Sequence, residues 1–113
     1  MLQGDYLVVL TTCPDEGSAE GIARVLVEQG LAACVNILPK GRSIYKWRDL
    51  LETSEEHVLL IKTHAARYAL LEQAIKTAHP YELPEIIAVP VVKGLLGYLS
   101  WIDEIIGEEI ACK

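Results

Sequence analysis

The sequence predicts one domain with a mixed α/β fold of the α+β type, built on an antiparallel sheet. Apolar, β-branched runs of strand length alternate with segments in which apolar residues recur every three or four positions. The runs follow one another in the order β-α-β-β-α-β, with one more helix at the C-terminal end. A length of 113 residues suits a single domain with one modest core.

The first strand and helix are the clearest elements. Residues 6–12 form a short apolar run that Pro14 closes, as expected of a buried strand. Asp15 is placed to cap the helix that follows, and Gly30 stands where that helix would end in a left-handed residue. The helix itself is indicated by apolar residues at helical spacing: Ala19, Ile22, Ala23 and Leu26.

A long hairpin is expected next. Residues 33–47 read as a strand interrupted near residues 39–41, and residues 52–63 as a third strand that turns apolar at its end. Arg48 and Asp49 are the turn between them. Residues 43–47 mix aromatic and polar side chains, which suits an exposed or partner-facing strand.

The second half supplies a helix, an edge strand and a last helix. The second helix must end before Pro80, because the residue before a proline avoids helical angles. Residues 86–92 form a fourth strand, and Pro90 inside it requires an edge or a bulge. The two helices are marked by Tyr68, Leu71, Ile75 and Ala78, and by Tyr98, Trp101, Ile102 and Ile105. With right-handed crossovers this order is the ferredoxin-like βαββαβ plan, with strand order 4-1-3-2, helices on one face and an added C-terminal helix.

Composition narrows the function classes. A formal net charge of −6 argues against binding to nucleic acid or to anionic membranes. Cys13, Cys34 and Cys112 are odd in number and form no Cys-x-x-Cys pair, so reduced thiols in the cytoplasm are expected, and no signal or membrane segment is apparent. Hydrophobic residues make up 51% of the chain, and we expect some of them to be buried between subunits.

The predicted topology brings together three side chains that can bind metals. Strand 4 runs antiparallel beside strand 1, so Cys13, His79 and Glu85 are expected to converge. A thiolate, an imidazole and a carboxylate suit copper or zinc. Purely structural roles are the alternative: Cys13 as a small turn residue, His79 bonded to a carbonyl at a helix end, Glu85 paired with a cation. His57 and His64 are expected to be solvated near strand ends.

Aromatic side chains point to an interface and not to catalysis. Trp47 lies near the tip of a hairpin with little core beneath it, and aromatic anchors are enriched in interfaces. Tyr45 and Tyr81 are expected to join it in a cleft between subunits. No nucleophile elbow or phosphate-binding loop is present, and Asp15 and Glu16 would repel phosphate after the first strand. The chain is therefore expected not to be an enzyme.

Five segments, in this order and at these spacings, resemble one known family. They are Leu-Ala-Ala-Cys-Val-Asn at residues 31–36, Ser-Ile-Tyr-Lys-Trp at 43–47, Ile-Lys-Thr at 61–63, His-Pro-Tyr-Glu-Leu-Pro-Glu at 79–85 and Tyr-Leu-Ser-Trp at 98–101. The chain, from about residue 6 to residue 105, closely resembles the CutA divalent-cation tolerance proteins. It departs from them where some members have a cysteine in place of Thr11, a second histidine in place of Ala78, or a glycine in place of Asp49.

The resemblance implies a ferredoxin-like fold, a homotrimer with strand pairing between long hairpins, and an architecture similar to the PII signalling proteins. It also implies a role in tolerance of copper and other divalent cations, and no enzymatic activity. The leading hypothesis is a trimeric cytoplasmic protein that binds a divalent cation weakly through His79 and Glu85, with Cys13 as a third ligand. The alternative is a PII-like sensor or scaffold whose cleft, lined by Tyr45, Trp47, His79, Tyr81 and Glu85, binds a small molecule or a protein.

Overall fold

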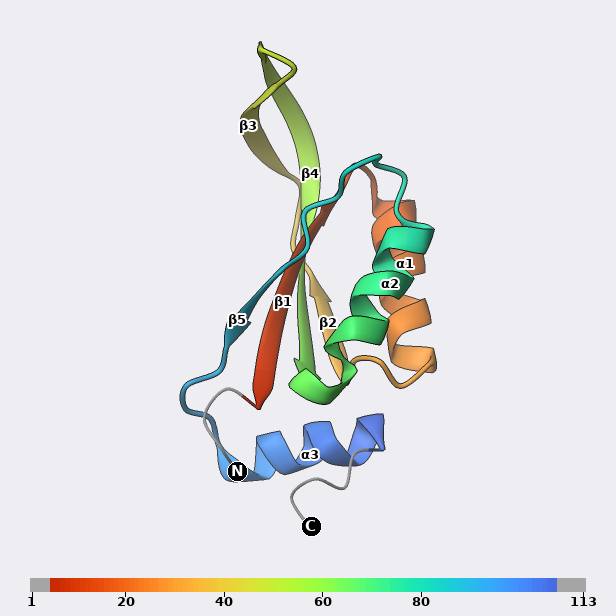
Figure 1. Cartoon of the computed structure of the whole chain (residues 1–113), viewed down its shortest axis with the longest axis vertical. Coiled ribbons are helices and arrows are strands. Elements are labelled where there is room, and N and C mark those ends of the chain that lie inside the picture. Colours follow the sequence, from red (N-terminus) through yellow and green to blue (C-terminus); the bar gives the residue numbers. More distant parts are fainter. Residues whose placement is uncertain (1–4, 108–113) are drawn as a thin grey trace.

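The computed structural model describes residues 5–107. Figure 1 shows a twisted sheet with helices along one side and another helix below it. The elements in chain order are β1 (Tyr6–Cys13), α1 (Glu16–Glu28), β2 (Cys34–Ile37), β3 (Gly41–Trp47), β4 (Leu50–His64), the 3₁₀ turn η1 (Ala65–Arg67), α2 (Tyr68–Ala78), β5 (Ile87–Pro90) and α3 (Leu96–Ile106).

The sheet has the predicted order. Its strands run β2-β4-β1-β5, and β3 pairs with the outer part of β4. The predicted second strand corresponds to β2 and β3 together, broken near Pro39, so the order 4-1-3-2 is confirmed. All pairings are antiparallel. β5 is an edge strand, as Pro90 requires, and Pro90 lies opposite Leu7 of β1.

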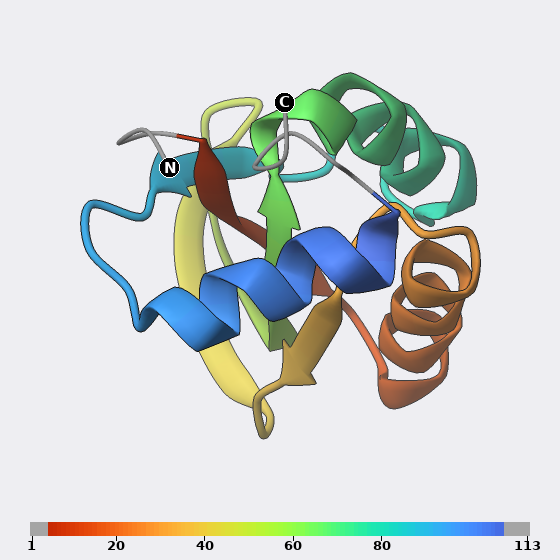
Figure 2. The same cartoon turned by 90° about the horizontal axis from the view of Figure 1, so that it is seen from below.

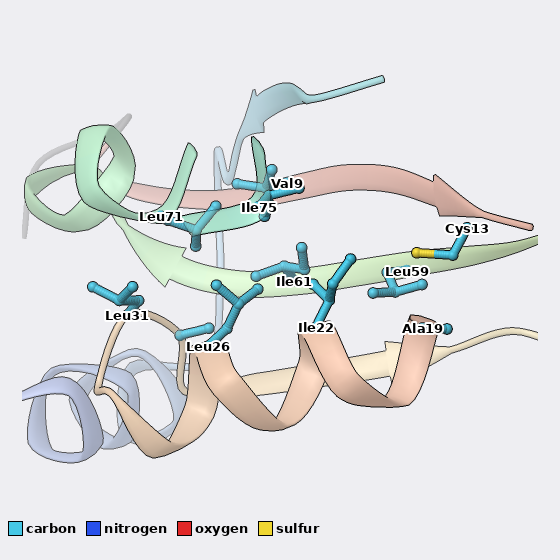
Figure 3. Close-up of a cluster of buried hydrophobic side chains, with 11 residues drawn as sticks. Val9, Cys13, Ala19, Ile22, Leu26, Leu31, Leu59, Ile61, Leu71 and Ile75 are labelled. Carbon is cyan, nitrogen blue, oxygen red and sulfur yellow. The ribbon is translucent and has the colours of Figure 1, made fainter. Parts of the chain in front are cut away.

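One core lies between the sheet and the two crossover helices. Val9 of β1 and Ile61 of β4 stand opposite each other and are fully buried. Leu26 of α1 and Ile75 of α2 reach the same cluster from the helices. Figure 3 shows these side chains meeting between the layers. Cys13, at the end of β1, belongs to this core as well.

The third helix closes one end of the sheet instead of joining the helical layer. Figure 2 shows α3 crossing that end, with α1 and α2 to one side. Ile102 and Ile106 pack with Tyr6 and Ala33 in a second, smaller cluster. The Tyr6 hydroxyl donates a hydrogen bond of 2.6 Å to Oδ2 of the buried Asp103. Burial and this carboxylate raise the pKa of Tyr6, which keeps the phenol protonated as the donor.

The ends of α1 follow the sequence signals. The backbone N–H of Ser18 donates to the Asp15 side chain at 2.7 Å, which caps the helix. Gly30 has φ +70°, the left-handed conformation expected after the last turn. The helix α2 ends at Ala78, and His79 is the extended residue that follows it. The chain then enters the segment that carries the candidate site.

The β3–β4 hairpin projects away from the body of the molecule (Figure 1). The molecule measures 50 × 26 × 23 Å along its principal axes, and the hairpin accounts for its elongation. The hairpin pairs from Gly41 opposite Glu56 to Trp47 opposite Leu50. A two-stranded ribbon of this kind is marginally stable on its own.

The hairpin turn leads to a first prediction. Arg48 and Asp49 both have positive φ, 52° and 68°, which side chains with a Cβ adopt at a cost. Asp49→Gly removes that cost at one position, so we expect the free energy of unfolding to rise by about 0.5–1 kcal/mol. Chemical denaturation at one fixed protein concentration measures it. Asp49→Ala keeps a Cβ at the same left-handed position and is the control. A similar gain for Asp49→Ala would contradict the explanation.

Candidate functional site

A groove lies between the β3–β4 hairpin and the segment that follows α2. Its volume is about 590 Å³. The hairpin contributes one wall, and the segment from Pro80 to Glu85 contributes the other. Thr12, near the end of β1, completes it. The lining residues are Thr12, Ser43, Ile44, Tyr45, Trp47, Glu56, Pro80, Tyr81, Glu82, Leu83 and Glu85.

The groove contains a buried carboxylate, that of Glu56. Alternation along β4 turns Leu59 and Ile61 toward the helices, and Glu56 toward the opposite face. Glu56 is only 5% exposed. Its Oε2 accepts a hydrogen bond of 2.6 Å from the Tyr81 hydroxyl, and burial together with this carboxylate raises the pKa of Tyr81. Within residues 5–107 no basic side chain forms an ion pair with Glu56.

Three aromatic rings, those of Tyr45, Trp47 and Tyr81, line the same groove as this carboxylate. The Tyr45 hydroxyl lies 2.8 Å from Ser54 Oγ across the hairpin. Trp47 lies under the Arg48 guanidinium, whose carbon is 5.4 Å from the ring centroid. Arg48 also forms an exposed ion pair of 3.4 Å with Glu82 at the rim. The walls of the groove are thus aromatic and acidic, and none of the lining residues is basic.

His79 lies behind this wall and holds it in place. Its Nε2 donates to the Thr12 carbonyl at 2.7 Å, and its Nδ1 accepts from the Tyr81 backbone N–H at 3.0 Å. The ring is 8% exposed and lies 4.9 Å from the Tyr81 ring, centroid to centroid. One nitrogen donates and the other accepts, so the neutral ring keeps no free lone pair for a metal. His79 fastens the start of the segment to the end of β1.

Cys13 contacts His79 but is turned toward the core. Its Sγ lies 3.9 Å from His79 Nε2, and its side chain is fully buried. Burial, followed by the nearby Asp15 charge, raises the pKa of the thiol to about 11. The thiol is therefore protonated at neutral pH, whereas metal ligation requires the thiolate.

The predicted metal trio is brought together only in part. Cys13 and His79 meet, as the topology predicted, but Glu85 lines the groove with Thr12 while Cys13 lies in the core. In the part of the chain that the structure describes, no three His, Cys, Asp or Glu side chains are grouped so that they could hold a metal ion. Cys13, His79 and Glu85 therefore do not fit copper or zinc as a set in this conformation. Their role as ligands stays a prediction.

The structure brings the predicted cleft residues together. Tyr45, Trp47, Tyr81 and Glu85 all line one groove, and His79 supports it from behind. That a second subunit closes the groove stays a prediction. Sequence reasoning missed Glu56. The signal was present, because strand alternation places residue 56 on the face opposite to the buried Leu59.

Fold and groove define a class of protein: a ferredoxin-like α+β domain with an extended hairpin and a groove beside it. The family model described as CutA1 divalent ion tolerance protein matches residues 7–105. The chain therefore belongs to the CutA1 family.

Named relatives agree with this assignment. The divalent-cation tolerance protein CutA of Thermus thermophilus is 45% identical over 97 residues, which cover 86% of this chain and 94% of that protein. Its solved structure superimposes with a TM-score of 0.86 over 88% of this chain and 96% of that one. Human protein CutA is 40% identical over 90% of this chain, which spans only 57% of the human protein's length.

A third relative bears on location. The Archaeoglobus fulgidus structure, with a TM-score of 0.87, 36% identity and coverage of 89% of this chain and 98% of that one, is described as a periplasmic divalent cation tolerance protein. Among residues 5–107, no helix has the length and apolar character needed to cross a bilayer. Cys13 and Cys34 are both free thiols, and Cys112 lies outside the described residues.

Proposed function

We propose that this protein serves in divalent-cation tolerance, as its relatives are named, and that it acts as a cytoplasmic homotrimer. The groove of Tyr45, Trp47, Tyr81 and Glu85 beside the projecting hairpin carries the proposal, because it gathers the predicted cleft residues at one place. The hairpin supports assembly. In the single chain the exposed fractions of three apolar residues of this two-stranded hairpin are high: 69% for Ile44, 64% for Leu50 and 75% for Leu51. Binding to another subunit would bury it.

Divalent cations would bind weakly. Glu85 offers an exposed carboxylate, but His79 must release either the Thr12 carbonyl or the Tyr81 N–H before its ring can ligate. Breaking such a bond costs on the order of 1 kcal/mol or more. The Cys13 thiol must also lose its proton against a pKa of about 11. Copper or another divalent ion would therefore be held mainly by Glu85 and His79, and more tightly as the pH rises.

Calorimetric titration of copper and zinc into the purified protein tests this prediction. We expect weak binding to the wild type, and at least about tenfold weaker binding to the His79→Ala/Glu85→Ala variant, because a ligand carboxylate and imidazole are lost. Glu85→Gln alone keeps the His79 hydrogen bonds and should show most of the loss. Glu104→Gln, an exposed carboxylate on α3, is the control. Equal binding by the wild type and the double variant would refute the ligand assignment.

A PII-like sensor or scaffold is the second candidate function. One observation favours it: the groove is lined by aromatic and polar groups that could contact a ligand. Among the described residues, by contrast, Cys13, His79 and Glu85 do not form a group that could hold a metal ion. In this role the groove would take a small molecule or a protein segment, and the cation effect would be indirect. Absence of metal binding with retention of a small-molecule ligand would favour this candidate over the first.

A further inference from the structure

The lining of the groove selects for the charge of its ligand. Glu56, Glu82 and Glu85 line it together with the rings of Tyr45, Trp47 and Tyr81, and no lysine or arginine is among the lining residues. Aromatic faces attract cations, and they do so more strongly where water is excluded. Among the lining residues an anionic ligand would meet carboxylates and no basic side chain; the nearest guanidinium, that of Arg48 at the rim, is paired with Glu82. The groove therefore suits a positively charged ligand.

The burial of Glu56 makes the argument specific. The Glu56 residue is only 5% exposed, and a buried carboxylate is costly unless it is paired; within residues 5–107 its hydrogen-bond donor is the neutral Tyr81 hydroxyl. Its neighbour Glu55 shows the contrast, because Glu55 is exposed and forms an ion pair of 3.3 Å with Lys40. Glu56 thus has one hydrogen bond and no counter-charge. A cation in the groove would supply it.

We propose that the groove binds an aliphatic amine whose ammonium group lies at Glu56 and whose alkyl chain lies along the rings of Tyr81 and Tyr45. An ammonium group supplies three donors for carboxylate and hydroxyl oxygens, and its CH₂ groups can pack against aromatic faces. The exposed Glu85 at the rim would receive a second ammonium group of a diamine. This inference uses the groove of the proposed function but requires no metal ion.

Calorimetry with diaminobutane tests the inference, in the presence of a chelator so that metal binding cannot contribute. Butanediol is the matched neutral ligand. We expect the diamine to bind and the diol to bind at least about tenfold more weakly, since a charge-assisted hydrogen bond is worth that much. The emission of Trp47 should change during the titration in a Trp101→Phe background, because Trp101 is not part of the groove.

Two variants and one control locate the site. Glu56→Gln should weaken diamine binding about tenfold or more, whereas Glu55→Gln should leave it unchanged. Tyr45→Leu, on the exposed hairpin, should weaken it several-fold through the loss of the ring face, and it remains informative if Glu56→Gln does not fold. Equal binding of diamine and diol, no diamine binding at millimolar concentration, or full affinity in a folded Glu56→Gln or Tyr45→Leu variant would overturn the inference. Copper binding by Glu85 would be unaffected by such a failure.

Discussion

Replacing Ile61 by alanine should lower the free energy of unfolding by about 2–5 kcal/mol. Ile61 lies in β4, the central strand, and is fully buried. It stands opposite Val9 of β1 and Val35 of β2, so its side chain is held on both sides by neighbouring strands. Its side chain faces the two crossover helices (Figure 3). Because all these elements are fixed by the sheet, the cavity left by the missing atoms can close only in part, and the cost falls in the upper range for apolar truncations.

The matched control is Leu70→Ala on the outer side of α2. Leu70 is 60% exposed, so its truncation removes little buried surface and should cost less than about 1 kcal/mol. Both variants are compared with the wild type by chemical denaturation at one protein concentration, because assembly would make stability concentration-dependent. A loss for Ile61→Ala no larger than that for Leu70→Ala would mean that the core is not where the structure places it.

Most of the fold could be predicted because its signals are local. The spacing of apolar residues distinguishes strand from helix, Asp15 and Gly30 mark the ends of α1, and Pro90 requires an edge strand. Handedness rules then leave few ways to join the strands. The predicted third strand began two residues late, at residue 52, because the turn at Arg48 and Asp49 is so tight that pairing already starts at Leu50.

Other features depend on contacts between distant segments. His64 was expected to be solvated, and this prediction is wrong: the ring is 5% exposed, its Nδ1 accepts from the Ala66 N–H, and it packs edge-on against Tyr6. The register places His64 opposite Tyr6, in the region that α3 covers, and the position of α3 could not be read from periodicity.

The candidate site, too, could be predicted only in part. Topology predicted that Cys13 and His79 would meet, and they do. It did not predict on which side of β1 each donor would lie. Successive residues of a strand point to opposite faces, so Thr12 lines the groove and Cys13, the next residue of β1, faces the core. Glu85 lines the groove on the Thr12 side, away from the Cys13 thiol. A constellation inferred from strand order alone therefore identifies neighbours but not a ligand set.

Replacing both Ile44 and Leu51 by serine should abolish assembly while leaving each chain folded. In the hairpin register Ile44 lies opposite Thr53, and Leu51 lies opposite Lys46, so the two apolar side chains share one face of the hairpin. They are 69% and 75% exposed in the single chain. If subunits bury them, each contributes about 1.5–3 kcal/mol per subunit, and the double variant loses enough to dissociate a trimer at micromolar concentration.

Light scattering at low micromolar concentration should give a trimer mass for the wild type and a monomer mass for the Ile44→Ser/Leu51→Ser variant. The matched control changes two polar residues of the same hairpin, Arg42→Ser and Glu55→Ser, which are a cross-strand pair exposed to solvent. This control should remain a trimer, because exposed charged pairs contribute little. A trimeric apolar-to-serine variant, or a monomeric wild type, would contradict the view that the hairpin is the contact between subunits. A monomeric variant that still binds the ligand would show that the groove of one chain is sufficient, although Ile44 itself lines that groove.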